Sequence, residues 1–166
     1  MHPCAVCASR QKTCCQRTEI LLTRGDLDRI GAATGRADFH ERRRPIDLDY
    51  LAHDPEDPDW LALTVAADGS RRMLRRRDDG DCIFLGTEGC VLTEETRPLV
   101  CRLYPFHYTS RGLDGVDEGY CPVELFRDRG ATMVLVLGMK AEQAETWRRL
   151  LYAELRTEEV ERCASA

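Results

Sequence analysis

Residues 4–15 read Cys4-Ala5-Val6-Cys7-Ala8-Ser9-Arg10-Gln11-Lys12-Thr13-Cys14-Cys15, a stretch with four cysteines and almost no large apolar side chain. Such a segment cannot build a hydrophobic core of its own, so something else must order it. A bound metal can do this, because the free energy of ligation appears as free energy of folding. The opening stretch therefore predicts a fold that is organised around a metal.

The remaining cysteines are spread along the chain. Seven, ten and nineteen residues separate Cys82, Cys90, Cys101 and Cys121, and Cys163 lies in the polar C-terminal tail. These spacings are too wide for a zinc knuckle and place single ligands on separate loops. We treat Cys163 as a spare thiol and predict eight metal ligands. They are Cys4, Cys7, Cys14, Cys15, Cys82, Cys90, Cys101 and Cys121.

The cysteine pattern leaves two questions open. The eight thiols can form two four-thiolate sites, or one site accompanied by buried or redox-active thiols. The Cys4-x2-Cys7 pair favours zinc, whereas a ligand set made only of cysteine with irregular spacing favours an iron–sulfur cluster. The predicted cofactor is therefore zinc or iron, the latter as an iron–sulfur cluster.

Composition sets the class of protein. The chain has 166 residues, of which 43% are hydrophobic and 32% charged, so we expect one soluble domain over residues 1–166. The net charge of −5 argues against a broad nucleic-acid surface. No apolar run is long enough to cross a membrane, and the N-terminus lacks the pattern of a secretory signal. We expect a cytoplasmic protein whose predicted partner is a metal ion; the sequence identifies no protein partner.

Hydrophobic periodicity and turn residues predict an α+β fold, in which helices pack on a short hairpin or sheet and the cysteine loops meet at one end. Thr23 and Asp26 mark a helix start, and Gly35 marks its end. The other expected elements are a short helix over 37–43, a surface connection over 45–59, a hairpin of 61–67 with 71–77, a strand over 82–85, a helix over 94–103, a strand or buried helix start over 134–137, and a helix over 140–155.

Several segments together resemble the YkgJ-like cysteine-cluster family. They are the opening cysteines, Cys82-Ile83-Phe84-Leu85, Gly89-Cys90-Val91-Leu92 and Arg97-Pro98-Leu99-Val100-Cys101-Arg102-Leu103-Tyr104-Pro105-Phe106. The resemblance covers roughly residues 4–121 and implies a zinc- or iron-chelating domain of a mainly bacterial family. The common family opening has two residues between the second cysteine and the Cys-Cys pair, but six separate Cys7 from Cys14 here. This longer loop changes how Cys7 and Cys14 can share an ion.

Some relatives in that family are linked to N-methylation of flagellin lysines. The sequence holds no glycine-rich loop after a strand that would cradle S-adenosylmethionine, so we predict no methyltransferase residues. An iron–sulfur redox or protein-modifying enzyme stays as an alternative, and it predicts an open cleft with Arg102, Tyr104 and His107 facing in. A metal-free thiol redox sensor is a further alternative, and it requires an exposed thiolate of low pKa at Cys14 or Cys15.

Two groups of arginines have competing interpretations. Arg97 and Arg102 can donate hydrogen bonds to thiolates, or they can form surface ion pairs with Glu94 or Glu95. The basic run over residues 71–77 can bind an acidic partner, but we interpret it as a solvated strand balanced by nearby aspartates.

Overall fold

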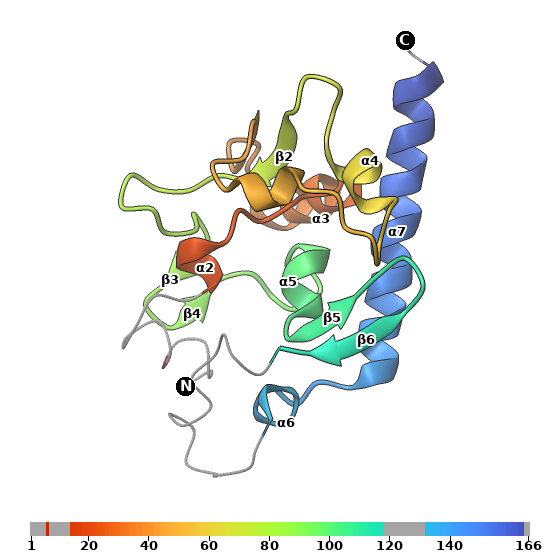
Figure 1. The fold of residues 1–166 in the computed structure, drawn as a ribbon. Helices are drawn as coiled ribbons and strands as arrows, with labels where there is room; N and C mark the ends of the chain where they lie inside the picture. The colour runs from red at the N-terminus through yellow and green to blue at the C-terminus, as the bar shows by residue number, and fades with distance from the viewer. Residues whose placement is uncertain (1–5, 7–13, 118–131, 165–166) are drawn as a thin grey trace.

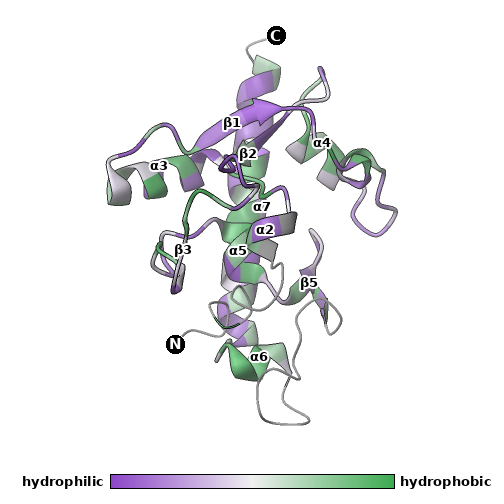
Figure 2. Cartoon of the chain, turned by 90° about the vertical axis from the view of Figure 1, so that its left-hand side faces the viewer, coloured by the Kyte–Doolittle hydropathy of each residue, from purple (hydrophilic) through white to green (hydrophobic). Residues whose placement is uncertain are grey.

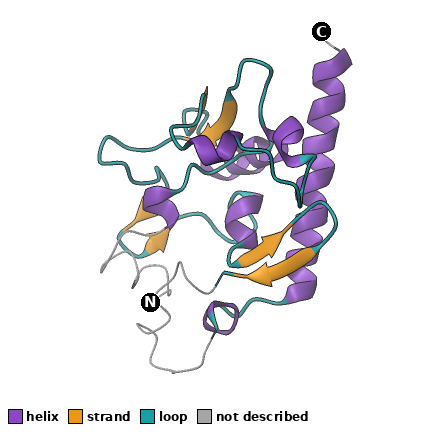
Figure 3. Cartoon of the chain, viewed as in Figure 1, coloured by secondary structure: helices purple, strands orange, loops and turns teal. Residues whose placement is uncertain are grey.

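A computed structural model describes residues 6, 14–117 and 132–164 of the chain. It confirms the α+β class, because helices surround short antiparallel strand pairs (Figure 1, Figure 3). Among the described residues the strands form three separate two-stranded pairs, β1 with β2, β3 with β4 and β5 with β6. No helix in this part of the chain is both long and apolar enough to cross a membrane.

The longest element is α7 (Ala141–Ala164), which runs along one side of the molecule (Figure 1). The predicted helix over 140–155 is confirmed, and it continues nine residues further, from 156 to 164. Its buried face packs against α4 (Trp60–Thr64), α5 (Leu99–Leu103) and β6 (Leu113–Val116). We call the resulting cluster the α7 core; it comprises Leu21, Leu63, Leu99, Leu103, Phe106, Ala144, Trp147, Leu151, Tyr152 and Leu155.

A second cluster lies on the other side of α5. It gathers side chains from α3 (Arg24–Thr34), from β2 (Arg71–Leu74) and from the segment around β3 (Leu85–Gly86). We call it the cysteine-side core; it comprises Ile20, Leu22, Ile30, Phe39, Leu74, Cys82, Phe84, Leu85 and Leu92, with Cys15, Cys90 and Cys101 packed against it.

The helix predicted between Thr23 and Gly35 is confirmed as α3. The Thr23 side chain accepts a hydrogen bond from the Asp26 N–H, and the Asp26 carboxylate accepts one from the Thr23 N–H, which is a capping box. Gly35 ends the helix with φ of 67°, a left-handed conformation that glycine adopts without steric cost.

The short helix predicted over 37–43 is wrong. Residues 40–43 form strand β1 (His40–Arg43), which pairs antiparallel with β2 in a register that sets His40 opposite Leu74. Figure 2 shows β1 as a hydrophilic strand at one end of the molecule, as its composition requires. Pairing with β2 satisfies the backbone and lets the preceding Phe39 enter the cysteine-side core, so tertiary context overrides local propensity.

The hairpin predicted from 61–67 and 71–77 is also wrong, although its turn at Gly69 exists, with φ of 78°. The apolar residues before the turn form helix α4, because Trp60, Leu63 and Thr64 share one face at helical spacing. The Thr64 hydroxyl donates to the Trp60 carbonyl at 2.8 Å. The strand after the turn takes β1 as its partner instead.

The remaining short elements are shifted or shortened relative to the predictions. Of the strand predicted over 82–85 only Leu85 belongs to β3, which pairs with β4 (Gly89–Cys90). The helix predicted over 94–103 begins only at Leu99, because Pro98 disfavours helical geometry in the residue before it. Residues 134–137, left open as strand or helix, belong mostly to α6 (Met133–Val136).

Other elements lie where the sequence placed no regular structure. The connection over 45–59 is mostly exposed, as predicted, and contains the 3-10 helix η1 (Leu48–Leu51). A short helix α2 (Cys14–Arg17) precedes α3, and β5 (Phe106–Tyr108) follows a cis peptide bond between Tyr104 and Pro105.

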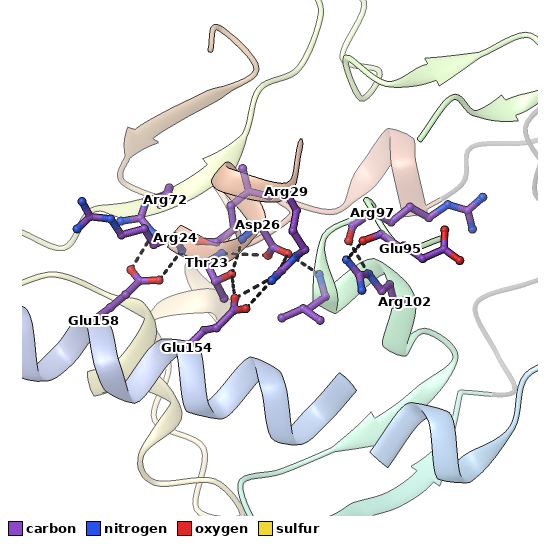
Figure 4. A network of polar contacts seen from close by, with 12 residues as sticks. Thr23, Arg24, Asp26, Arg29, Arg72, Glu95, Arg97, Arg102, Glu154 and Glu158 are labelled. Atoms are coloured by element: carbon purple, nitrogen blue, oxygen red, sulfur yellow. Dashed lines mark hydrogen bonds and ion pairs between the residues drawn. The ribbon is translucent and has the colours of Figure 1, made fainter. Parts of the chain in front are cut away.

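A network of charged side chains joins α3 to α7 (Figure 4). Arg29 donates to Glu154 at 2.5 Å and to Asp26 at 2.7 Å. The same Asp26 carboxylate accepts the Leu99 N–H at 3.1 Å, so it also touches the first turn of α5. One buried carboxylate therefore ties together the helices that border both cores.

Candidate metal centre

The β3–β4 hairpin and the turn before it position two of the predicted ligands, Cys90 and Cys82. Leu85 lies opposite Cys90 and Gly86 opposite Gly89, where a φ of 106° requires glycine. Just before the hairpin, the Cys82 N–H donates to the Cys15 carbonyl at 2.8 Å. This bond links the turn before β3 to α2. Backbone contacts therefore hold together the three segments that carry Cys15, Cys82 and Cys90.

Backbone N–H groups donate to the sulfur atoms of Cys82 and Cys90. The Phe84 N–H donates to Cys82 Sγ at 3.4 Å, and the same turn accounts for the loss of the predicted strand at 82–84. The Leu92 N–H donates to Cys90, two residues before it. Such bonds stabilise a thiolate and are the usual second layer of a metal–cysteine site.

Cys101 comes from a further segment of the chain. It lies in the middle of α5, where its N–H donates to the Pro98 carbonyl at 2.9 Å. The thiols of Cys15, Cys82 and Cys90 each disfavour ionisation of Cys101, which indicates that the four sulfur atoms face one region. All four cysteines line the same cavity, whose volume is about 370 Å³.

The electrostatics of these thiols depend on burial. Burial raises the pKa of Cys82 to about 12, and it also raises the pKa of Cys90 and of Cys101. Without a cation, these three groups are therefore neutral thiols at pH 7. Ionising several of them together requires positive charge close to the sulfur atoms, which a bound metal ion can supply.

Arg97 supports the thiols, as one of the two interpretations of the sequence predicts. Its guanidinium lowers the pKa of Cys90 through charge and a hydrogen bond, which opposes the larger effect of burial, and it also donates to the Leu92 carbonyl at 3.2 Å. Arg102 follows neither interpretation. It is buried, and it donates to the backbone carbonyls of Arg97, at 2.7 Å, and of Glu95. Arg102 thereby holds the turn that carries Arg97.

The structure places the eight predicted ligands unequally. Cys15, Cys82, Cys90 and Cys101 surround the cavity, and Cys14 begins α2. Cys4, Cys7 and Cys121 lie outside the described residues. Across residues 14–117 and 132–164, no three Cys, His, Asp or Glu side chains are arranged closely enough to hold a metal ion by themselves. Cys163 is exposed on α7, away from the cavity lining.

The cavity also contains residues that sequence reasoning missed. Arg71 was interpreted as part of a solvated strand, but it is only 2% exposed and lines the cavity. Arg71 is buried because three of the four residues of β2 are buried, and the predicted hairpin had paired this strand with the wrong partner. Of the residues expected to face a catalytic cleft, Arg102 and Tyr104 line the cavity, whereas His107 is exposed on β5.

Comparison with known proteins gives one match. Residues 3–122 match the CxxCxxCC family model, whose description is "Putative zinc- or iron-chelating domain". The matched region contains all eight predicted ligands and excludes Cys163. No curated protein and no solved structure matches the chain.

Proposed function

Because this chain belongs to the CxxCxxCC family of zinc- or iron-chelating domains, we propose that it binds a metal through the cysteine thiolates around its cavity. Cys82, Cys90 and Cys101 are the central ligands, with Cys15 beside them. We propose that Cys4, Cys7, Cys14 and Cys121 contribute further thiolates. The single observation that carries the proposal is the convergence of four thiols from separate segments on one cavity.

The chemistry of this set fits a soft or borderline cation. Cys82, Cys90 and Cys101 are free thiols, as a reducing cytoplasm would keep them. The N–H groups of Phe84 and Leu92 and the guanidinium of Arg97 would offset part of the negative charge that several thiolates bring. The bound metal would supply the remaining positive charge and cross-link the segments that carry its ligands.

A structural or regulatory role follows from this arrangement. The ligands come from α2, from the turn before β3, from β4 and from α5. These elements are too short to be stable alone, so a metal would fix them in place. We propose that residues 1–166 form a single domain of this kind. Zinc and an iron–sulfur cluster both suit a set of cysteine thiolates.

The test is metal analysis on protein purified without oxygen, combined with a visible absorption spectrum. Stoichiometric zinc in a colourless protein, or iron with acid-labile sulfide in a brown one, would support the proposal and identify the metal. Cys82→Ser and Cys101→Ser should each lose most of the metal, whereas Cys163→Ser, the matched control, should retain it. Metal-free wild-type protein, or equal loss in all three variants, would refute the proposal.

A further inference from the structure

The cavity holds a buried positive charge that the metal function does not require. Arg71 begins β2, opposite Arg43 of β1, and its side chain turns into the molecule. Its Cζ lies 4.6 Å from the centroid of the Tyr50 ring. The Nε and Nη1 atoms are buried and have no hydrogen-bond partner in the part of the chain that the structure describes. Buried guanidinium groups almost always have such partners, so this pair of donors calls for an explanation.

Among the described residues, no acid neutralises Arg71. The charge of Glu19 favours the protonated arginine, but the Glu19 carboxylate is already engaged. One oxygen lies 2.6 Å from Arg43 Nη1, and the other accepts the N–H groups of Ile46 and Asp47. Within the described segments, Arg71 forms no ion pair. Burial lowers its pKa, yet an arginine stays protonated in proteins, so a positive charge remains.

The rest of the cavity is suited to an apolar molecule. Part of the cavity wall is aromatic and is formed by Trp60, Phe106 and Tyr108. Another part is aliphatic and includes Leu21 and Met139. Tyr108 interacts electrostatically with both Arg71 and Cys101, so it lies near the buried cation and near this cysteine. A volume of about 370 Å³ falls within the range of small-molecule pockets.

We propose that this cavity binds a small monocarboxylate with an apolar or aromatic body, and that Arg71 pairs with its carboxylate. The planar guanidinium presents parallel N–H donors that match a carboxylate. Arg97 and Arg102 also line the cavity, but both donate to backbone carbonyls, so Arg71 is the arginine there that one carboxylate would satisfy. A phosphate dianion would bring a second negative charge close to Glu19, Glu94 and Asp117, which line the same cavity. The body of the ligand would extend along the aromatic wall towards the cysteines.

Isothermal titration calorimetry on the full chain at pH 7 tests the proposal. The probes are acetate, hexanoate, benzoate and indole-3-acetate, the matching uncharged amide of each, and inorganic phosphate. At least one of the larger carboxylates should bind at one per chain, with its amide at least about tenfold weaker. Binding of no carboxylate, equal binding of acid and amide, or tighter binding of phosphate would overturn the proposal.

Variants locate the binding. Arg71→Gln should weaken carboxylate binding by about tenfold or more, and Arg71→Lys should restore part of it. Arg75→Gln removes the same charge from an exposed position one residue beyond β2 and should leave binding unchanged. An equal loss in the Arg71→Gln and Arg75→Gln variants would mean that only net charge matters, and this would overturn the proposal.

Two further measurements separate this site from structural effects and from the metal. Arg71→Met should melt at the same or a higher temperature than the ligand-free wild type, because it removes an uncompensated buried charge. A larger fall than Arg75→Met produces would assign Arg71 to the fold and overturn the proposal. Metal content should be unchanged in the Arg71 variants. If the wild-type protein is purified without any metal and still binds the carboxylate, the metal function is refuted and the carboxylate site is not.

Discussion

The α7 core and the cysteine-side core are built by different means. The α7 core centres on a 24-residue helix whose fully buried residues include Ala144 and Leu151, so apolar burial alone can stabilise it. The cysteine-side core packs side chains of α3 and β2 against two-residue strands and turns that carry thiols. The difference indicates that the first region is self-sufficient, whereas the second needs a cross-link that a bound metal would supply.

Removal of the metal should have the largest effect, because it should destabilise the cysteine-side core much more than the α7 core. Structural zinc contributes apparent binding free energies of roughly 10–16 kcal/mol in small zinc domains, so chelation should cost the cysteine side most of its stability. Hydrogen exchange should become fast in β3, β4 and their flanking turns, while the centre of α7 should stay protected. Uniform loss of protection would show that the two regions are one cooperative unit.

A substitution that leaves an empty space in the α7 core should destabilise that core and leave the metal site unchanged. Leu151 is fully buried, so Leu151→Ala should lower the free energy of unfolding by about 2–5 kcal/mol. Metal content should remain as in the wild type, because Leu151 is not among the cavity-lining residues. Chemical denaturation with parallel metal analysis measures both. Loss of metal in this variant would indicate that the α7 core also positions the ligands.

The smallest expected effect comes from an ion pair at the start of α7. Arg148 donates to the two Glu145 oxygens at 2.7 and 2.8 Å and lowers the pKa of Glu145 from 4.5 to about 2. Because the folded pKa is depressed, the stabilisation is present above pH 4.5 and is lost as the pH falls towards 2. The pair is partly exposed, so Glu145→Gln should cost less than about 1 kcal/mol at pH 7.

Denaturation of the Glu145→Gln variant and the wild type as a function of pH checks this expectation. The difference between them should shrink towards zero near pH 2, with and without metal. A difference that persists at pH 2, or that depends on the metal, would show that Glu145 stabilises the protein by some other means.

Local sequence signals predicted some elements well. The Thr23–Asp26 capping box, Gly35 and the helix over 140–155 are each determined by neighbours in sequence, and all are found in the structure. Strand pairing is not local. Residues 71–74 pair with β1 rather than with the nearer 61–67, because the burial of Phe39 and Leu63 in different cores decides the partner. Cys15, Cys82, Cys90 and Cys101 were among the eight predicted ligands, but their grouping was left open, and nothing in their spacing indicated that Arg71 would join the same cavity.

The capping of α3 has a consequence for the order of folding. Besides its own capping box, the start of this helix receives two carboxylates from α7. The Thr23 hydroxyl donates to Glu154, and the Arg24 N–H donates to Glu158 at 2.5 Å. These partners lie 131 and 134 residues later in the chain, so the ribosome adds them well after α3. Pairing over such a separation is slow, so a newly made chain carries α3 with an incomplete N-terminus until α7 docks.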